Sequence, residues 1–365
     1  MRATWLGGMA LGLGLLFAGL QGSAGPVPVG GDYKVLEPIR HGNLTVFPVV
    51  AARSHDTSEF ITLDEGLRSG EVVVTEYGNV QGLVRPRDGR QPGYGRPVPT
   101  GAQVNTLVLV NNSKRPLLLL AGEIVTGGKQ DRVIGKDRLV PAESDPVDLS
   151  VFCVEPGRWV GRSEKFGTAL APVPPMAAPN VRSKAMADKD QAKVWSEVGK
   201  SRQIMSAEVS AAAPAINSTS SYAGMAQNPD VQKQVDSVAE PIRHDYESVI
   251  KRLHDQNAVG VVVAVNDQIV WADIFASTHL LQKYWPKLIR SYATEAVITR
   301  AKGATVSAKA AQEFLDEMQG RRETVESEPG IYRHTEITGD GFKAFELTSL
   351  LPKTGFDLHV AKMAD

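Results

Sequence analysis

The chain has 365 residues, 42% of them hydrophobic and 22% charged, a composition typical of a globular protein with one large domain or two smaller ones. Its 40 lysine and arginine residues nearly balance its 41 aspartate and glutamate residues. This balance excludes a global positive field, so nucleic acid is not an expected partner and any anion site must be local. Because Cys153 is the single cysteine, an intramolecular disulfide is also excluded.

The first 24 residues have the pattern of a secretory signal peptide. Arg2 precedes an apolar stretch from Leu6 to Leu20, and small residues follow around Gly22 and Ala24. The alternative is an uncleaved membrane anchor, but the stretch is rich in glycine and falls short of the roughly 20 residues that a membrane span needs. We therefore expect residues 1–24 to be cleaved, the mature protein to have no membrane span, and its location to be secreted or periplasmic.

Residues 43–121 are predicted to form β-strands. Short runs of branched and aliphatic residues alternate there with turn formers. The runs are 43–51, 71–77, 105–112 and 115–123. The turn formers "VNNSKRP" (110–116) predict a hairpin between the last two runs. Residues 81–101, rich in Pro, Gly and Arg, predict a long exposed loop.

The middle of the chain is predicted to be mainly helical. Residues 170–182 form an extended Pro/Ala connector, and residues 188–209 place Val194, Val198, Ile204 and Met205 at helical spacing. The low-complexity stretch 209–224 predicts a mobile loop. Residues 230–256 resume a helix, in which Pro241 predicts a break or kink.

The last third returns to strands. Residues 258–276 predict a hairpin with an Asn266–Asp267 turn, followed by helices over 280–301 and 307–320. Residues 331–337, 342–349 and 357–363 then predict a β-meander. No βαβ alternation is visible, so we expect an α+β fold with antiparallel sheets and a helical middle segment. Residues 25–365 form either one domain or two lobes (about 32–170 and 240–365) joined by residues 171–239.

The stretch "GEIVTGGKQDRV" (122–133) is the densest group of candidate site residues. Its spacing approaches a P-loop, but Gln130 stands where that motif needs a hydroxyl and no suitable helix follows, so we reject a nucleotide site of that kind. Glu123, Lys129, Gln130, Asp131 and Arg132 nevertheless lie within ten residues, beside a glycine pair able to adopt positive φ. The stretch is either a solvated turn or part of a site.

A second stretch, "DLSVFCVEPGRW" (148–159), strengthens the case for a site. Strand alternation places Cys153 and Glu155 on one face, and the following turn presents Arg158 and Trp159. A carboxylate beside a thiol discourages a thiolate, so Cys153 is interpreted as a small buried residue. Glu155 and Arg158 are either an ion pair at a turn or an acid with an anion receptor.

These motifs carry a resemblance to a known family. "LAGEIVTGGKQDRV", "VFCVEPGRW" and "DQAKVW", with further stretches over most of the mature chain, resemble the domain family named for its association with ADP-ribosylglycohydrolases and rhodanese-phosphatases. The family has no established chemistry. Its pattern maps onto Glu123, Lys129, Gln130, Arg132, Glu155, Arg158, Trp159, Gln191 and other residues of these stretches.

Two functions remain open. In the first, the two stretches line a pocket for a phosphorylated or carboxylated, nucleotide-like molecule. Glu123 or Glu155 would then serve as general base, and the ligand would contact Lys129, Gln130, Arg132, Arg158, Trp159 and Gln191. In the second, the same residues form a buried ion-pair network in a non-catalytic envelope module. The seven histidines show no zinc-ligand spacing, so neither a metal nor another cofactor is expected.

Overall fold

The computed structural model describes residues 33–76, 83–84, 105–167, 173–253 and 256–365. Most described strands are antiparallel and helices fill the middle of the chain, which confirms the α+β prediction. The predicted signal peptide and most of the predicted loop 81–101 lie outside the described residues. No helix in the described part of the chain is both long and apolar enough to cross a membrane.

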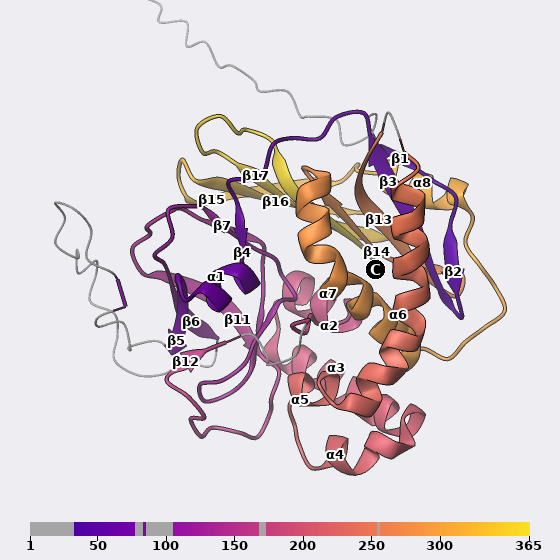
Figure 1. The fold of residues 1–365 in the computed structure, drawn as a ribbon, viewed down its shortest axis with the longest axis horizontal. Helices are drawn as coiled ribbons and strands as arrows, with labels where there is room; N and C mark the ends of the chain where they lie inside the picture. Colours follow the sequence, from indigo (N-terminus) through magenta and orange to yellow (C-terminus); the bar gives the residue numbers. More distant parts are fainter. Residues whose placement is uncertain (1–32, 77–82, 85–104, 168–172, 254–255) are drawn as a thin grey trace, which may run out of the picture.

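The largest sheet joins the two ends of the described chain (Figure 1). Its strand order is β1-β3-β13-β14-β18-β17-β16-β15, with β2 beside β3. The strands are β1 (Tyr33–Val35), β2 (Ile39–His41), β3 (Leu44–Ala51), β13 (Asn257–Val265), β14 (Gln268–Phe275), β15 (Arg321–Glu328), β16 (Tyr332–Gly339), β17 (Phe342–Ser349) and β18 (Asp357–Ala364). The predicted β13–β14 hairpin and the C-terminal meander are confirmed; β15 was not predicted.

Helices cover both faces of the central part of this sheet, which explains the nearly continuous apolar runs of β3 and β13. On one face, α6 (Pro229–Ile250) and α7 (Thr278–Ile298) lie side by side (Figure 1) and share a core with Val261 and Val263. On the other face, α8 (Ala308–Asp316) packs against the alternate residues Phe47 and Val262. Because both faces are covered, all of β3 is buried, with no exposed polar face.

Two smaller sheets carry the motifs of interest. The first has the order β12-β5-β6-β11-β9-β8 and the second β10-β7-β4. Their strands are β4 (Ile61–Thr62), β5 (Val72–Glu76), β6 (Thr106–Asn111), β7 (Leu117–Leu119), β8 (Ile124–Val125), β9 (Arg132–Ile134), β10 (Arg138–Val140), β11 (Val147–Cys153) and β12 (Lys165–Phe166). Helix α1 (Leu63–Ser69) follows β4 directly.

The prediction of a hairpin at 110–116 is wrong. Strand β6 pairs with β5 and β11, whereas β7 belongs to the other small sheet, where it pairs with β10 and β4. Asn111 gives the physical reason: its side-chain amide donates to the carbonyl oxygens of Arg115 and Pro141. These bonds hold the linker in a turn that directs the chain into a second sheet.

The helical middle is more regular than predicted. The stretch 209–224, expected as a mobile loop, holds three short helices whose buried side chains include Ile216 and Tyr222. Helix α6 runs unbroken through Pro241. In the helix predicted over 188–209, Ile204 is 39% exposed and not part of the core. The elements are α2 (Pro179–Ser183), the π-helical turn η1 (Lys184–Asp188), α3 (Gln191–Glu208), the 3₁₀ turn η2 (Ser210–Ala212), α4 (Ala213–Asn217) and α5 (Tyr222–Ala226).

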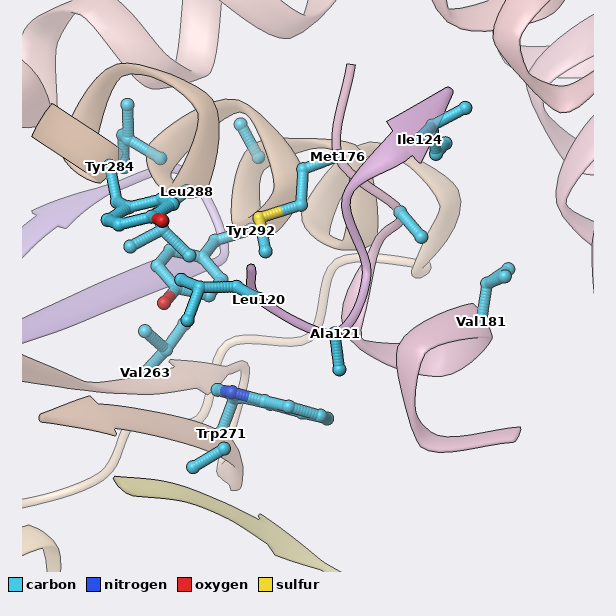
Figure 2. Close-up of a cluster of buried hydrophobic side chains, with 14 of the residues drawn as sticks. Leu120, Ala121, Ile124, Met176, Val181, Val263, Trp271, Tyr284, Leu288 and Tyr292 are labelled. Atoms are coloured by element: carbon cyan, nitrogen blue, oxygen red, sulfur yellow. The ribbon is translucent and has the colours of Figure 1, made fainter. Parts of the chain in front are cut away.

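The small sheets meet the large one around the segment that follows β7. Figure 2 shows Leu120 and Ala121 of this segment among side chains of the large sheet and of α7, including Trp271 and Tyr292. All belong to one buried cluster. The motif that begins at Gly122 therefore starts inside the core of the molecule rather than at its surface.

Candidate functional site

Gly122 makes a sharp turn that only glycine fits. It has φ +94°, in the left-handed region. Its backbone also approaches Arg182 so closely that a Cβ atom would lie 2.6 Å from Arg182 Cγ. The chain leaves this turn with the next side chain, Glu123, buried in the interior.

Glu123 is one of two carboxylates that share the ammonium of Lys287. Glu123 Oε1 lies 2.6 Å from Lys287 Nζ, and its Oε2 accepts a hydrogen bond from the backbone N–H of Leu120 at 2.7 Å. Lys287, on α7, also pairs with Asp64 of α1. Burial raises the pKa of Glu123 against the attraction of Lys287. Burial disfavours the charged form of Lys287. The two carboxylates outweigh this effect and raise the pKa of Lys287, so the amine is protonated at neutral pH.

Lys287 lines a polar cavity of about 260 Å³ between α1 and α7. Lys283, one helical turn earlier, lies on the same wall and donates to Glu65 Oε2 at 2.9 Å and to the carbonyl oxygen of Phe60 at 3.1 Å. The polar and charged lining residues are Thr62, Asp64, Glu65, Arg68, Lys283 and Lys287. Glu123 therefore lies behind the lysine that faces the cavity.

The first backbone N–H groups of the "GGKQD" turn (127–131) donate to side chains of the protein itself. Gly127 and Gly128 have φ +127° and +47°, as their glycine identity predicts. The backbone N–H groups of Gly127, Gly128 and Lys129 all donate to side-chain oxygens, at 3.1, 3.2 and 2.6 Å. The acceptors are Asp131, Ser163 and Glu76 respectively. A phosphate cradle needs such amides directed at a ligand, so this geometry agrees with the rejection of a P-loop.

Glu155 is the centre of a buried ion-pair cluster. Its Oε2 lies 2.6 Å from Arg158 and accepts from the backbone N–H of Asp131 at 3.1 Å, while its Oε1 lies 3.2 Å from Arg162. Gln130 donates to the carbonyl oxygen of Glu155 at 3.2 Å. Burial opposes the charge of Glu155, but Arg158 outweighs it and holds the carboxyl pKa below its usual value.

Asp131 completes this cluster. Arg158 lies 3.6 Å from Asp131 Oδ1, and the Ser221 hydroxyl donates to Oδ2 at 2.7 Å. Burial raises the pKa of Asp131, and the negative charge of Glu155 adds to the effect. The cluster thus joins the two sequence motifs, and most of its polar atoms are paired with each other.

Trp159 forms the exposed edge of the same region. Its side chain is 44% exposed. Lys129 Nζ lies 5.0 Å and the Arg132 guanidinium carbon 5.9 Å from the centre of its ring, within the range of cation–π contact. Arg132 itself is buried, which lowers the pKa of its guanidinium.

Gln191 clamps α3 to β11. Its Oε1 accepts from the backbone N–H of Cys153 at 2.8 Å, and its Nε2 donates to the carbonyl oxygen of Cys153 at 2.9 Å. Both ends of the predicted ligand-binding amide are therefore engaged by the backbone. Burial raises the pKa of the Cys153 thiol, in agreement with its interpretation as a small buried residue.

A fully buried network around Asp273 was not predicted from the sequence. Arg182 donates to both of its carboxylate oxygens at 3.0 and 3.1 Å, and His359 Nε2 lies 3.1 Å from Oδ1. Trp271 Nε1 and the Tyr292 hydroxyl donate to the same carboxylate. Burial opposes the charge of Asp273, but Arg182 outweighs it and holds the pKa far below its usual value.

His359 extends this network to a second carboxylate. Its Nδ1 lies 2.5 Å from Asp137 Oδ2, and Asp137 Oδ1 accepts from the backbone N–H of Ala121. Burial disfavours the imidazolium, but the two aspartates outweigh it and raise the pKa of His359 to about 9. The signal in the sequence was one acidic residue, Asp273, inside the apolar run of β14.

A family model described as the ARG and Rhodanese-Phosphatase-superfamily-associated Protein domain matches residues 32–361. Neither the curated proteins nor the solved structures gave a match to the chain. The match spans nearly the whole described chain and includes every cluster above. The chain therefore belongs to the ARG and Rhodanese-Phosphatase-superfamily-associated Protein domain family.

Proposed function

We propose that the protein binds a small molecule with a carboxylate or phosphate group in the cavity between α1 and α7. The observation that carries this proposal is the position of Lys287: it lines an open polar cavity while Glu123, from the family motif, holds its ammonium from behind. Asp64 shares the same ammonium, so an anionic group of a ligand would accept from the remaining N–H of a cation whose position is set before the ligand arrives.

The other lining residues narrow the ligand class. Arg68 adds a positive charge and is exposed at the helix surface, whereas the charge of Lys283 is paired with Glu65. Asp64, whose side chain is 13% exposed, can accept hydrogen bonds from a hydroxyl or amine of the ligand. An anion that also carries hydroxyl or amine groups fits best, such as a sugar phosphate, a nucleotide-like molecule or a hydroxy acid.

A ligand-binding role is better supported than a reaction in which Glu123 or Glu155 acts as the general base. Both carboxylate oxygens of Glu123 and of Glu155 already accept hydrogen bonds or contact cations. The low pKa of Glu155 also makes it a weak base. We therefore assign Glu123 to positioning Lys287.

The alternative is a non-catalytic envelope module. The self-satisfied cluster of Glu155, Arg158 and Asp131 favours it, because a closed network of this kind fixes the packing of neighbouring segments. In that case the cavity beside Lys287 would bind no nucleotide, sugar phosphate or dicarboxylate. Export is part of both proposals and rests on the signal-peptide pattern; N-terminal sequencing of the mature protein tests it.

The test is a thermal-shift and calorimetric screen against ADP-ribose, nucleotides, sugar phosphates and dicarboxylates. A ligand at about 100 times its dissociation constant should add roughly 2.7 kcal/mol to the free energy of unfolding. Lys283→Gln and Arg68→Gln should weaken binding while the protein stays folded. Lys309→Gln, which changes an exposed lysine of α8, is the control. Absence of binding by the whole panel, or equal loss in the control, would support the envelope module instead.

A further inference from the structure

The cavity beside Lys287, between α1 and α7, is lined by charged groups of both signs. Asp64 and Arg68 lie one helical turn apart on α1, so they share a face of that helix. Lys283 and Lys287 lie one turn apart on α7 in the same way. With Glu65 of α1, the lining contains three cationic and two carboxylate side chains. A ligand in this cavity therefore meets both kinds of charge.

Two of the three cations are already paired with carboxylates of the lining. Lys287 contacts Asp64, and Lys283 donates to Glu65. Arg68 is exposed and has no ion-pair partner within the described part of the chain. One unpaired cation balances one carboxylate of a ligand. A doubly charged phosphate would bring a second negative charge into a lining that already holds two carboxylates, which is unfavourable.

The two carboxylates of the lining can accept further hydrogen bonds. Asp64 contacts Lys287 through Oδ2, and Glu65 uses Oε2 for the backbone N–H of Thr62 and for Lys283. Asp64 Oδ1 and Glu65 Oε1 accept no hydrogen bond from the described residues, and both atoms are accessible. An ammonium group offers three N–H donors and a positive charge, whereas a hydroxyl group offers one donor. An amine of the ligand is therefore the better partner for these oxygens.

We propose that this cavity binds an α-amino acid with an aliphatic side chain. The carboxylate of the ligand accepts from Arg68 and from the remaining N–H of Lys287, and its ammonium donates to Asp64 Oδ1 and Glu65 Oε1. The inference rests on the binding function proposed above and narrows its ligand to a zwitterion with no net charge.

The dimensions and the apolar part of the lining agree with such a ligand. An α-amino acid carries its two charged groups on one carbon, and Asp64 and Arg68 are separated by one helical turn, about 5.4 Å along the axis. Val173, Pro174 and Pro286 are the apolar residues of the lining, and they suit an aliphatic side chain. The cavity of about 260 Å³ has room for a small amino acid.

The experiment is a calorimetric titration of the full mature chain with L-leucine and with (S)-2-hydroxy-4-methylpentanoate, in which a hydroxyl replaces the ammonium. We expect leucine to bind at least about 10-fold more tightly, as for hydrogen bonds between charged groups. Equal affinities, or tighter binding of the hydroxy acid, would overturn the inference and leave the proposed function standing. Absence of leucine binding would also overturn it, whereas the anion panel above tests the proposed function by itself.

Variants of the two carboxylates test the contact with the ammonium. Asp64→Asn should weaken leucine binding by about 10-fold. Binding of the hydroxy acid should stay the same or become tighter, because Lys287 loses a competing carboxylate. Glu65→Gln is the second variant, since glutamine keeps an acceptor for the Thr62 N–H. A preference for leucine that persists in both folded variants would contradict the proposal.

Two further variants complete the comparison. Arg68→Gln should weaken leucine and the hydroxy acid by the same factor, because the two ligands share the carboxylate that Arg68 faces. Asp267→Asn, in the exposed turn between β13 and β14, is the matched control and should change neither affinity. An effect of Asp267→Asn equal to that of Asp64→Asn, or a loss confined to leucine in Arg68→Gln, would contradict the assigned orientation of the ligand.

Discussion

At the scale of single residues, the protein buries several ionisable groups, and the surroundings of each decide its charge. Asp273 stays ionised because Arg182 contacts both of its oxygens. Lys287 stays protonated between Glu123 and Asp64. Glu295 of α7 has no such cationic partner in the described contacts. Burial alone therefore does not determine these charges; the nearest partner does.

Gly122→Ala should strongly destabilise the protein. The change forces an alanine into φ +94° and places its Cβ atom 2.6 Å from Arg182 Cγ, so the expected loss is about 2–4 kcal/mol of unfolding free energy. Gly42→Ala is the matched control, because Gly42 has φ +59° but a Cβ atom added there would meet no heavy atom within 4 Å; it should cost about 1 kcal/mol. Urea unfolding measures both. Equal losses of unfolding free energy would mean that the close contact with Arg182 does not add to the cost of the substitution.

Glu295→Gln should stabilise the protein at alkaline pH. Burial raises the pKa of Glu295 from 4.5 to about 7. A hydrogen bond from the backbone N–H of Asn180 opposes this shift, and the negative charge of Glu197 adds to it. Because the folded-state pKa is the higher one, its contribution is fully present below pH 4.5 and lost as pH rises through 7. The glutamine variant avoids this loss, so its advantage should grow between pH 5 and pH 8 to at most about 3 kcal/mol. A difference that does not change with pH would exclude this titration.

At the scale of elements, sequence periodicity predicts helices and strands well where one face is apolar. The hairpin of β13 and β14, the strand β11 and the helices α3, α6, α7 and α8 all follow their predicted patterns. Proline is the exception: Pro241 and Pro286 lie inside α6 and α7, which continue through them. Packing of these helices against the sheet outweighs the local penalty.

Pro241→Ala should stabilise α6. Proline in a helix interior lacks the N–H that bonds to the preceding turn and is about 3 kcal/mol less favourable than alanine, so we expect a gain of about 1–3 kcal/mol. Pro229→Ala is the internal comparison, because Pro229 occupies the first turn of α6, where the N–H would be unpaired in any case. Chemical denaturation of both variants measures the difference. A gain no larger than that of Pro229→Ala would show that α6 accommodates Pro241 without cost.

At the scale of the whole molecule, the network around Asp273 joins parts of the chain that are distant in sequence. His359 of β18 contacts Asp273 of β14 and also Asp137, which lies between β9 and β10 of the small sheets. Arg182 of α2 adds a fourth segment and packs over the ring of Trp271 at 4.3 Å. This network ties the large sheet to the small ones at the centre of the fold.

The network predicts a loss of stability at alkaline pH. The pKa of His359 is raised from 6.5 to about 9, so its contribution is fully present below pH 6.5 and is lost as pH rises through 9. In His359→Gln this dependence should disappear, and the stability difference from the wild type should shrink by about 3 kcal/mol between pH 6 and pH 10. Urea unfolding of both proteins across this range is the measurement. Parallel pH curves would mean that His359 does not carry a charge in the folded protein.

The α+β class, most of the elements and the family resemblance could be predicted from the sequence, because strand and helix periods and turn formers are local properties. The sequence also placed Glu155 and Arg158 at one turn, where they form an ion pair. Which partner each strand and each buried charge takes could not be predicted in this way and is seen only in the folded protein. Residues 110–116 lead into a second sheet, Glu123 meets Lys287 from 164 residues away, and His359 meets Asp137 from 222 residues away. Such pairings depend on how whole elements pack, and no local pattern encodes the distance between two buried charges.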